Sequence, residues 1–90
     1  MNTDAAASMP TDLLAVPEHR RADLETVLDL LRAADDIALT THVNADGDGA
    51  GSEAALAGWL LARGKRVAIV NPTPFPDKFA YMLPPGVELL

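Results

Sequence analysis

One short segment, residues 42–52 with the sequence HVNADGDGAGS, concentrates the side chains that could do chemistry. It places one imidazole, His42, within seven residues of two carboxylates, Asp46 and Asp48. Two carboxylates this close repel each other unless a cation or a proton lies between them. Mixed nitrogen and oxygen ligands suit borderline divalent ions such as Mn²⁺, Fe²⁺ or Zn²⁺. The spacing therefore predicts a metal site, where the ion would activate water and receive a phosphate oxygen.

Two nucleotide-binding motifs are alternative interpretations of this segment. A P-loop needs a lysine before its serine or threonine, but Gly51 leads directly into Ser52. A dinucleotide fingerprint that starts at Gly49 fits its looser form, with Gly51 and Ala54. No acidic residue closes the following strand to hold a ribose, because Asn71 stands there. Both motifs are therefore disfavoured.

A calcium loop and a purely structural role are further alternatives. An EF-hand frame that starts at Asn44 has Ala55 at its twelfth position, where a bidentate glutamate is required. An EF-hand also needs a helix before the loop, whereas residues 37–41 are typical of a strand. In the structural alternative, Asp48 caps the following helix and Asp46 shapes a turn.

The elements that must position this loop follow from the apolar pattern. A first helix is predicted with Pro17 as its first residue and with an end at Asp35-Asp36. Its apolar stripe consists of Leu24, Val27, Leu28 and Leu31. Residues 37–41 then form a strand, because they are rich in β-formers and bounded by polar residues. The acidic loop begins where this strand ends.

A second helix is predicted over residues 51–63, with Gly64 closing it. Its buried face is expected to contain Leu56, Trp59 and Leu60. Residues 66–70 form a second strand that is apolar after Arg66, as in parallel sheets covered on both faces. Strand, helix and strand make a parallel βαβ unit of the α/β class, in which ligands bind at the carboxyl ends of the strands. In the loop, Gly47 is expected to permit a bend, and Gly49 and Gly51 a close approach.

Composition narrows the possible functions. The 90 residues carry a net charge of −6, which disfavours coating of bare nucleic acid or anionic membranes. A phosphate substrate would therefore need a local cation. The absence of cysteine excludes disulfides, zinc–thiolate sites, iron–sulfur sites and cysteine nucleophiles. Residues 1–16 contain no secretory signal pattern and are expected to form a flexible tail. No apolar run in the sequence is long enough to span a membrane. We therefore expect a cytoplasmic location.

The end of the sequence suggests a further strand. Prolines make residues 71–76 an extended connection, and residues 79–83 suit one helical turn. Residues 87–90 follow the turn Pro84-Pro85-Gly86 and are typical of a strand. An apolar strand at a terminus needs a neighbour, so we expect the sequence to be truncated.

Residues 42–52 resemble the first motif of the DHH-family phosphoesterases. That family includes RecJ-like exonucleases, nano-RNases with 3′-phosphoadenosine 5′-phosphate (pAp) phosphatase activity, and cyclic-dinucleotide phosphodiesterases. The resemblance extends over about residues 20–90, with a helix before the first strand and the sequel Gly64-Lys65-Arg66-Val67 after the second helix. Ala45 stands where proline is common in the family, and Gly49 where alanine is common.

The resemblance implies that residues 17–90 are the N-terminal part of a DHH domain. His42 and Asp46 would bind one manganese ion and Asp48 the second, while Gly51 and Ser52 open the helix behind them. The full-length protein would hydrolyse short oligonucleotides or small nucleotides. The family's second-motif aspartate, its Asp-His-His motif and its smaller substrate-binding domain would lie beyond residue 90. The 90-residue chain alone is therefore expected to be inactive or nearly so.

Two other functions remain open from the sequence. The first is a non-catalytic truncated homologue, a metal- or partner-binding α/β module whose C-terminal strand could pair with another chain, as in a homo-oligomer. The second is a plain structural α/β domain that binds no metal.

Overall fold

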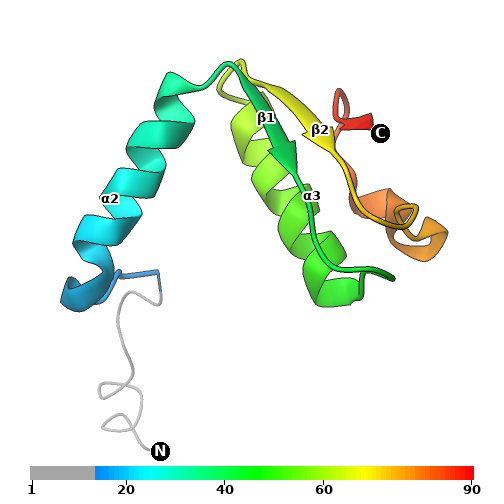
Figure 1. Ribbon diagram of the computed structural model, residues 1–90, viewed down its shortest axis with the longest axis horizontal. Coiled ribbons are helices and arrows are strands. Elements are labelled where there is room, and N and C mark those ends of the chain that lie inside the picture. The colour runs from blue at the N-terminus through cyan, green and yellow to red at the C-terminus, as the bar shows by residue number, and fades with distance from the viewer. Residues whose placement is uncertain (1–13) are drawn as a thin grey trace, which may run out of the picture.

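The computed structural model describes residues 14–90, which form helices and a small parallel sheet of the α/β class. The elements in chain order are α2 (Glu18–Ala33), β1 (Asp36–Leu39), α3 (Gly47–Leu61), β2 (Arg66–Ile69), the 3₁₀-helix η1 (Asp77–Met82) and β3 (Glu88–Leu89) (Figure 1). Most of the tail expected at residues 1–16 lies outside the described residues.

The three strands are parallel and lie in the order β1-β2-β3. Val70 N–H donates to Leu39 O at 2.8 Å, and Leu90 N–H donates to Ile69 O at 3.0 Å. Both bonds extend the strand pairing at the carboxyl end of the sheet. The predicted βαβ unit and the predicted strand at residues 87–90 are therefore confirmed, with β1 at one edge of the described sheet.

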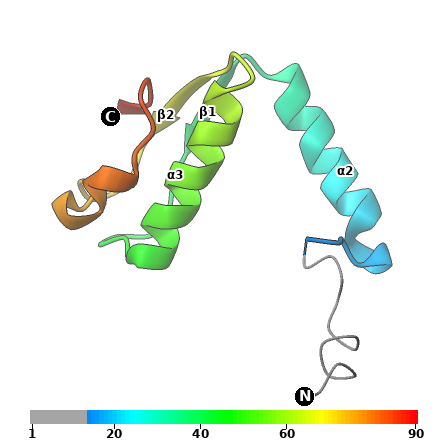
Figure 2. The same cartoon turned by 180° about the vertical axis from the view of Figure 1, so that it is seen from behind.

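Helix α3 covers one face of this sheet, as the view from behind shows (Figure 2). Val67 and Ile69 of β2 point to this face and are buried, and Ala57 and Leu60 of α3 are fully buried. Alanines at the contact let the helix axis approach the sheet closely. The opposite face is barely covered, because Ala38 is exposed and Ala68 is only half-buried. The expectation of cover on both faces is therefore wrong for the part of the chain that the structure describes.

Helix α2 extends away from the sheet (Figure 1). Pro17 is its N-cap rather than its first residue, because ψ at Pro17 is 141° and the helical turns begin at Glu18. The predicted stripe of leucines and valine lies on a helix as expected, but α2 contains no buried residue. Leu24 is 39% exposed. Leu31, another residue of the stripe, packs against the core formed by α3 and β2.

Helix α3 begins four residues earlier than predicted, at Gly47, and only part of its expected buried face is buried. Leu60 is fully buried, but Leu56 is 38% and Trp59 is 37% exposed. Arg63 stacks its guanidinium 3.6 Å from the centre of the Trp59 ring, which explains how the indole is covered without entering the core. Gly64 closes the helix as predicted, with a φ of +77°.

The rest of the chain agrees with the sequence pattern. Residues 71–76 contain no helix or strand, and η1 occupies Asp77–Met82 where one helical turn was predicted at 79–83. Gly86 has a φ of +95° in the turn before β3. Among residues 14–90, none of the helices combines the length and the apolar character needed to cross a membrane.

Candidate metal site

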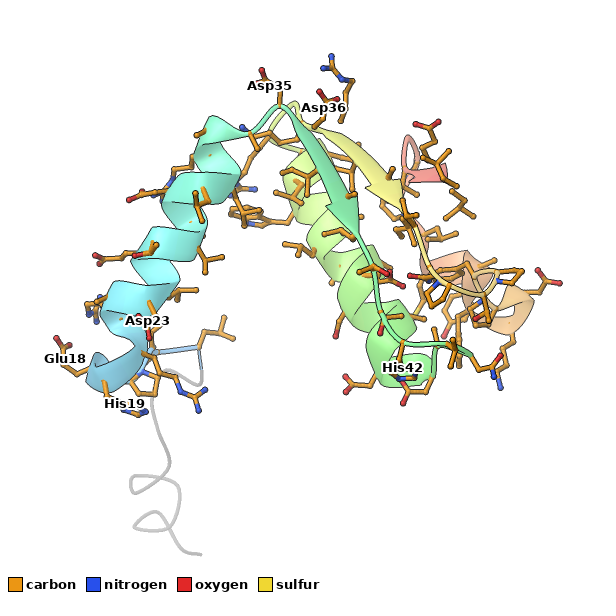
Figure 3. The ribbon with its side chains drawn as sticks, in the orientation of Figure 1. Glu18, His19, Asp23, Asp35, Asp36 and His42 are labelled. Atoms are coloured by element: carbon orange, nitrogen blue, oxygen red, sulfur yellow. The ribbon has the colours of Figure 1, made fainter. Side chains whose placement is uncertain are left out.

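The predicted site lies in the loop between β1 and α3, at the carboxyl edge of the parallel sheet. Figure 3 shows His42 at one end of this unit, beside the first turn of α3, and Asp35 and Asp36 at the other. In open α/β sheets the carboxyl edge is where ligands bind, because helix N-termini and flexible loops meet there. The topology therefore places His42 where the sequence predicted a site.

The bend in this loop occurs at Asn44. Its φ is +52°, in the left-handed region that asparagine tolerates better than most residues. Asn44 N–H donates to Oγ1 of Thr73 at 2.7 Å, so the segment after β2 fixes the bend. The expectation that Gly47 provides the bend is wrong, because Gly47 is already the first residue of α3.

Asp46 caps α3. Its Oδ1 accepts the N–H of Gly49 at 2.8 Å, and its backbone carbonyl accepts the N–H of Ala50 at 2.9 Å. The structural alternative assigned this cap to Asp48, but Asp48 lies in the first turn, where its charge suits the helix dipole. Capping uses one carboxylate oxygen of Asp46 and leaves Oδ2 turned toward His42.

His42 presents its second ring nitrogen to that oxygen. Nδ1 lies 2.7 Å from the carbonyl oxygen of Val43. A carbonyl only accepts, so Nδ1 must carry the proton, and in neutral histidine Nε2 then has a free lone pair. Nε2 lies 3.9 Å from Asp46 Oδ2. In this neutral form, Nε2 and Oδ2 are two acceptors that face each other and leave space for a cation between them.

The histidine and aspartate fit one borderline divalent ion as two of its ligands. A metal-bound histidine commonly donates its other ring N–H to a carbonyl or carboxylate, which is the role of Val43 here. Both side chains are well exposed, at 61% for His42 and 64% for Asp46, so an ion could reach them. Their donor types, imidazole nitrogen and carboxylate oxygen, suit Mn²⁺ among other ions.

Asp48 lies apart from this pair. It lines a shallow cavity of about 300 Å³, together with Leu39, Thr41, Ser52, Glu53 and Leu56. Residues 14–90 contain no group of three His, Cys, Asp or Glu side chains placed to hold a metal. The structure thus brings together His42 and Asp46 and leaves Asp48 on the neighbouring cavity.

Gly49 makes the close approach that the sequence predicted. A Cβ at this position would lie 2.9 Å from Oγ1 of Thr41 and 3.3 Å from Oδ1 of Asp46. A side chain at residue 49 would therefore force Thr41 Oγ1 or Asp46 Oδ1 to shift. Gly51 is different, since a Cβ there would meet only Met82 Sδ at 3.9 Å.

Three polar residues that support the loop were missed by sequence reasoning. Asn71 Oδ1 accepts the N–H of Thr41 at 3.1 Å, and Asn71 Nδ2 donates to Oε1 of Glu53 at 2.9 Å. Thr73 is the third, through its bond to Asn44. Two signals could have indicated them, namely a glutamate among the alanines of α3 and polar residues directly after an apolar strand.

A basic residue lies on η1, the element that touches the start of α3. The position of a Cβ on Gly47 would be 3.5 Å from the ring of Phe79, so η1 touches the start of α3. The ammonium group of Lys78 lies 5.2 Å from the centre of that ring. Lys78 is therefore a positive charge on the element that contacts the start of α3.

The ion pair between Asp36 and Arg66 does not belong to this site. These residues are partners in the β1–β2 register, at the opposite end of the strands from His42. Hydrogen bonding to Arg66 lowers the pKa of Asp36, and the same contact raises the pKa of Arg66. The pair links β1 and β2 at their N-terminal ends.

Comparison with known proteins gives no family assignment. No family model matches the chain, and searches of curated proteins and of solved structures found no match.

Proposed function

We propose that this chain carries part of the active site of a metal-dependent phosphoesterase of the DHH type. The observation that carries the proposal is the pairing of His42 Nε2 with Asp46 Oδ2 at 3.9 Å, at the carboxyl edge of a parallel sheet. The Val43 carbonyl orients the imidazole, and the helix cap orients the carboxylate. Both proposed ligands are thus held by the backbone before any ion binds.

The negative charge of the chain and of its two neighbouring aspartates favours a bound cation beside His42 and Asp46. The chain has a net charge of −6, and only Gly47 separates Asp46 from Asp48 at the start of α3. A phosphate would be repelled by these carboxylates unless a divalent cation lay between them. Manganese bound there would supply Lewis-acid activation of water and neutralise charge on a phosphate oxygen.

In this proposal His42 and Asp46 hold one manganese ion, and Asp48 serves the second. The substrate class, short oligonucleotides or small nucleotides such as pAp or cyclic dinucleotides, comes from the resemblance of residues 42–52 to the DHH motif. The remaining family motifs have no counterpart in residues 1–90, so the activity is proposed for a longer protein that contains this segment.

Manganese binding by the 90-residue chain tests the first part of this proposal. Electron paramagnetic resonance measures free Mn²⁺ directly, and thermal unfolding measures whether the ion stabilises the folded state. We expect the wild-type chain to bind Mn²⁺ and His42→Ala to lose this binding without losing its fold. Equal Mn²⁺ binding by both proteins would exclude the site.

Hydrolysis tests the second part. A longer gene product that contains this segment should hydrolyse pAp or a short oligoribonucleotide with Mn²⁺, and Asp48→Ala should abolish the reaction. Hydrolysis at the wild-type rate by Asp48→Ala would refute the assignment. For His42→Ala, the matched control is His19→Ala, because His19 lies on the first turn of α2, far from the loop (Figure 3).

A non-catalytic binding module is a second candidate, and exposed apolar side chains favour it. They lie on α2 and α3 and are Leu24, Val27, Leu30, Leu56 and Trp59. Apolar groups of this size on two helices are typical of a surface that meets a partner or a second copy. Light scattering after size-exclusion chromatography discriminates, because a module of this kind should form a defined oligomer or complex.

A further inference from the structure

Glu53 is the buried charged residue of the described chain. It is 5% exposed and lies on the face of α3 that also buries Ala50, Ala54 and Ala57. Removing a carboxylate from water costs free energy, and alanine has the higher helix propensity, so neither the helix nor the core needs a glutamate here. We therefore ask which hydrogen bond the carboxylate oxygens of Glu53 accept.

That contact is the side-chain amide of Asn71. Asn71 Nδ2 donates to Glu53 Oε1 at 2.9 Å, while Asn71 Oδ1 accepts the N–H of Thr41 at 3.1 Å. A carboxylate only accepts and a backbone N–H only donates, so the two partners fix which way the amide points. Without the acceptor at residue 53, only the bond to Thr41 would hold the amide.

The chain of hydrogen bonds ends at the backbone N–H of Thr41, one residue before the proposed ligand His42. Thr41 directly precedes His42, so its N–H anchors the backbone from which the imidazole projects. The anchor joins α3, the end of β2 and the end of β1 at one point, and Thr73 fixes Asn44 a few residues later. The loop of His42 is therefore held at two backbone positions by the segment after β2.

The second carboxylate oxygen is not needed for this arrangement. Glu53 Oε2 is buried and has no hydrogen-bond partner among residues 14–90. It takes no part in the bond to Asn71, so a neutral amide could replace the carboxylate at residue 53 and still accept that bond. A substitution by glutamine would therefore remove the charge of Glu53 and keep its hydrogen bond, so the two contributions can be tested separately.

We propose that Glu53 is a positioning residue that acts through Asn71. It fixes the backbone at Thr41 and so the direction in which His42 presents Nε2 to Asp46. The structural part depends on the hydrogen bonds alone, and its consequence for manganese rests on the proposed function. Glu53 itself touches neither proposed ligand.

Two variants of Glu53 isolate the hydrogen bond. Glu53→Gln and Glu53→Leu remove the same charge and have similar volume, but only glutamine can accept the bond from Asn71. On the 90-residue chain, hydrogen exchange of the Thr41 amide is followed by NMR without metal, and the Mn²⁺ dissociation constant by paramagnetic resonance. The Arg66 amide, which donates to Asp35 O at 2.8 Å at the opposite end of the sheet, reports on the fold.

We expect Glu53→Leu to raise both the Thr41 exchange rate and the Mn²⁺ dissociation constant by on the order of 10-fold or more, as for other residues that support metal ligands. Glu53→Gln should remain within about 3-fold of wild type in both, because the acceptor is retained. Wild-type Thr41 exchange in Glu53→Leu, or equal losses in both variants with the Arg66 amide still protected, would overturn the proposal.

A second variant covers the case in which Glu53→Leu does not fold. Asn71→Ala, at a half-buried position, removes both the bond to Glu53 and the bond to Thr41, so it should raise the Thr41 exchange rate at least as much as predicted for Glu53→Leu. Unchanged Thr41 exchange in Asn71→Ala would likewise overturn the proposal. If the wild-type chain binds no Mn²⁺, the proposed function fails, while Thr41 exchange still decides the role of Glu53.

Discussion

Gly49 and Thr41 contact each other where the first turn of α3 meets the end of β1. A Cβ on Gly49 would lie 2.9 Å from Thr41 Oγ1, closer than side chains tolerate without a shift. The two residues flank the proposed ligands in sequence, Thr41 just before His42 and Gly49 just after Asp48. The shape of the site therefore depends on this contact.

Gly49→Ala should destabilise the chain by about 1–3 kcal/mol, the usual cost of forcing an extra carbon into a packed contact. Gly51→Ala is the matched control on the same helix, because its nearest neighbour would be Met82 Sδ at 3.9 Å. It should leave stability unchanged or raise it by up to about 1 kcal/mol, the gain in helix propensity. Urea unfolding measures both.

Thr41→Ala in the Gly49→Ala background identifies the cause. The double variant lacks the crowding hydroxyl, so it should regain much of the stability lost in Gly49→Ala. A loss in Gly49→Ala that the second substitution leaves unchanged would indicate that the contact with Asp46 Oδ1, at 3.3 Å, is the limiting one.

Substitutions of Asp46 should separate its two roles. Asparagine caps helices as well as aspartate, so Asp46→Asn should keep stability within about 0.5 kcal/mol, whereas Asp46→Ala should lose about 1 kcal/mol with the cap. Both should lose Mn²⁺ binding, because neither retains the carboxylate that faces His42. Urea unfolding and Mn²⁺ titration check the two effects. Retained Mn²⁺ affinity in Asp46→Asn would show that Oδ2 is not a ligand.

The stability of the fold should fall strongly when Leu60 is replaced by alanine and hardly at all when Leu30 is replaced. Leu60 is fully buried between α3 and β2, so Leu60→Ala should cost about 2–5 kcal/mol and leave a chain of this size largely unfolded. Leu30 is 68% exposed on α2, and Leu30→Ala should change stability by less than about 0.5 kcal/mol. Circular dichroism during urea titration compares them. A large effect at Leu30 would mean that α2 packs against something in solution.

The ion pair of Asp36 and Arg66 predicts a dependence of stability on pH. The bond to Arg66 lowers the pKa of Asp36 from its usual 3.8, so the charged form is favoured by folding. Its contribution is therefore present above pH 3.8 and is lost as the pH falls below that value. Because the pair is exposed, the effect should be small and weakened by salt.

Asp36→Asn tests this sign. The variant should unfold at a slightly lower urea concentration than wild type at about pH 6, and the difference should vanish near pH 2.5, where Asp36 is protonated in both states. A difference of the same size at both pH values would mean that the charge of Asp36 is not the cause. Asp23→Asn, on α2, controls for the change in net charge.

Local pattern was sufficient for most of the elements. The spacing of Leu24 and its apolar partners predicts the first helix, and the β-formers after Asp36 and Arg66 predict the two main strands. The acidic loop falls at the end of β1, as its sequence order requires. These features depend on neighbouring residues in the chain, which is why they can be inferred without a structure.

Element ends and exposure were less predictable. Helix α3 begins at Gly47 because Asp46 caps it, whereas the structural alternative drawn from the sequence had assigned the cap to Asp48. Trp59 and Leu56 fit an apolar stripe, yet both are more than one-third exposed, since α3 meets the sheet along its alanines. Which side of a helix becomes buried depends on the neighbouring elements and not on the helix itself.

The sequence by itself determined that the chain has a strand-loop-helix unit with His42, Asp46 and Asp48 where its loop meets its helix. Only the tertiary structure decided that His42 faces Asp46 while Asp48 lines a separate cavity, because side-chain direction depends on the cap, on the bend at Asn44 and on the Val43 carbonyl. The support from Asn71 and Glu53 also required the fold. Those residues are 18 positions apart, and they meet the loop only when β2 pairs with β1 under α3.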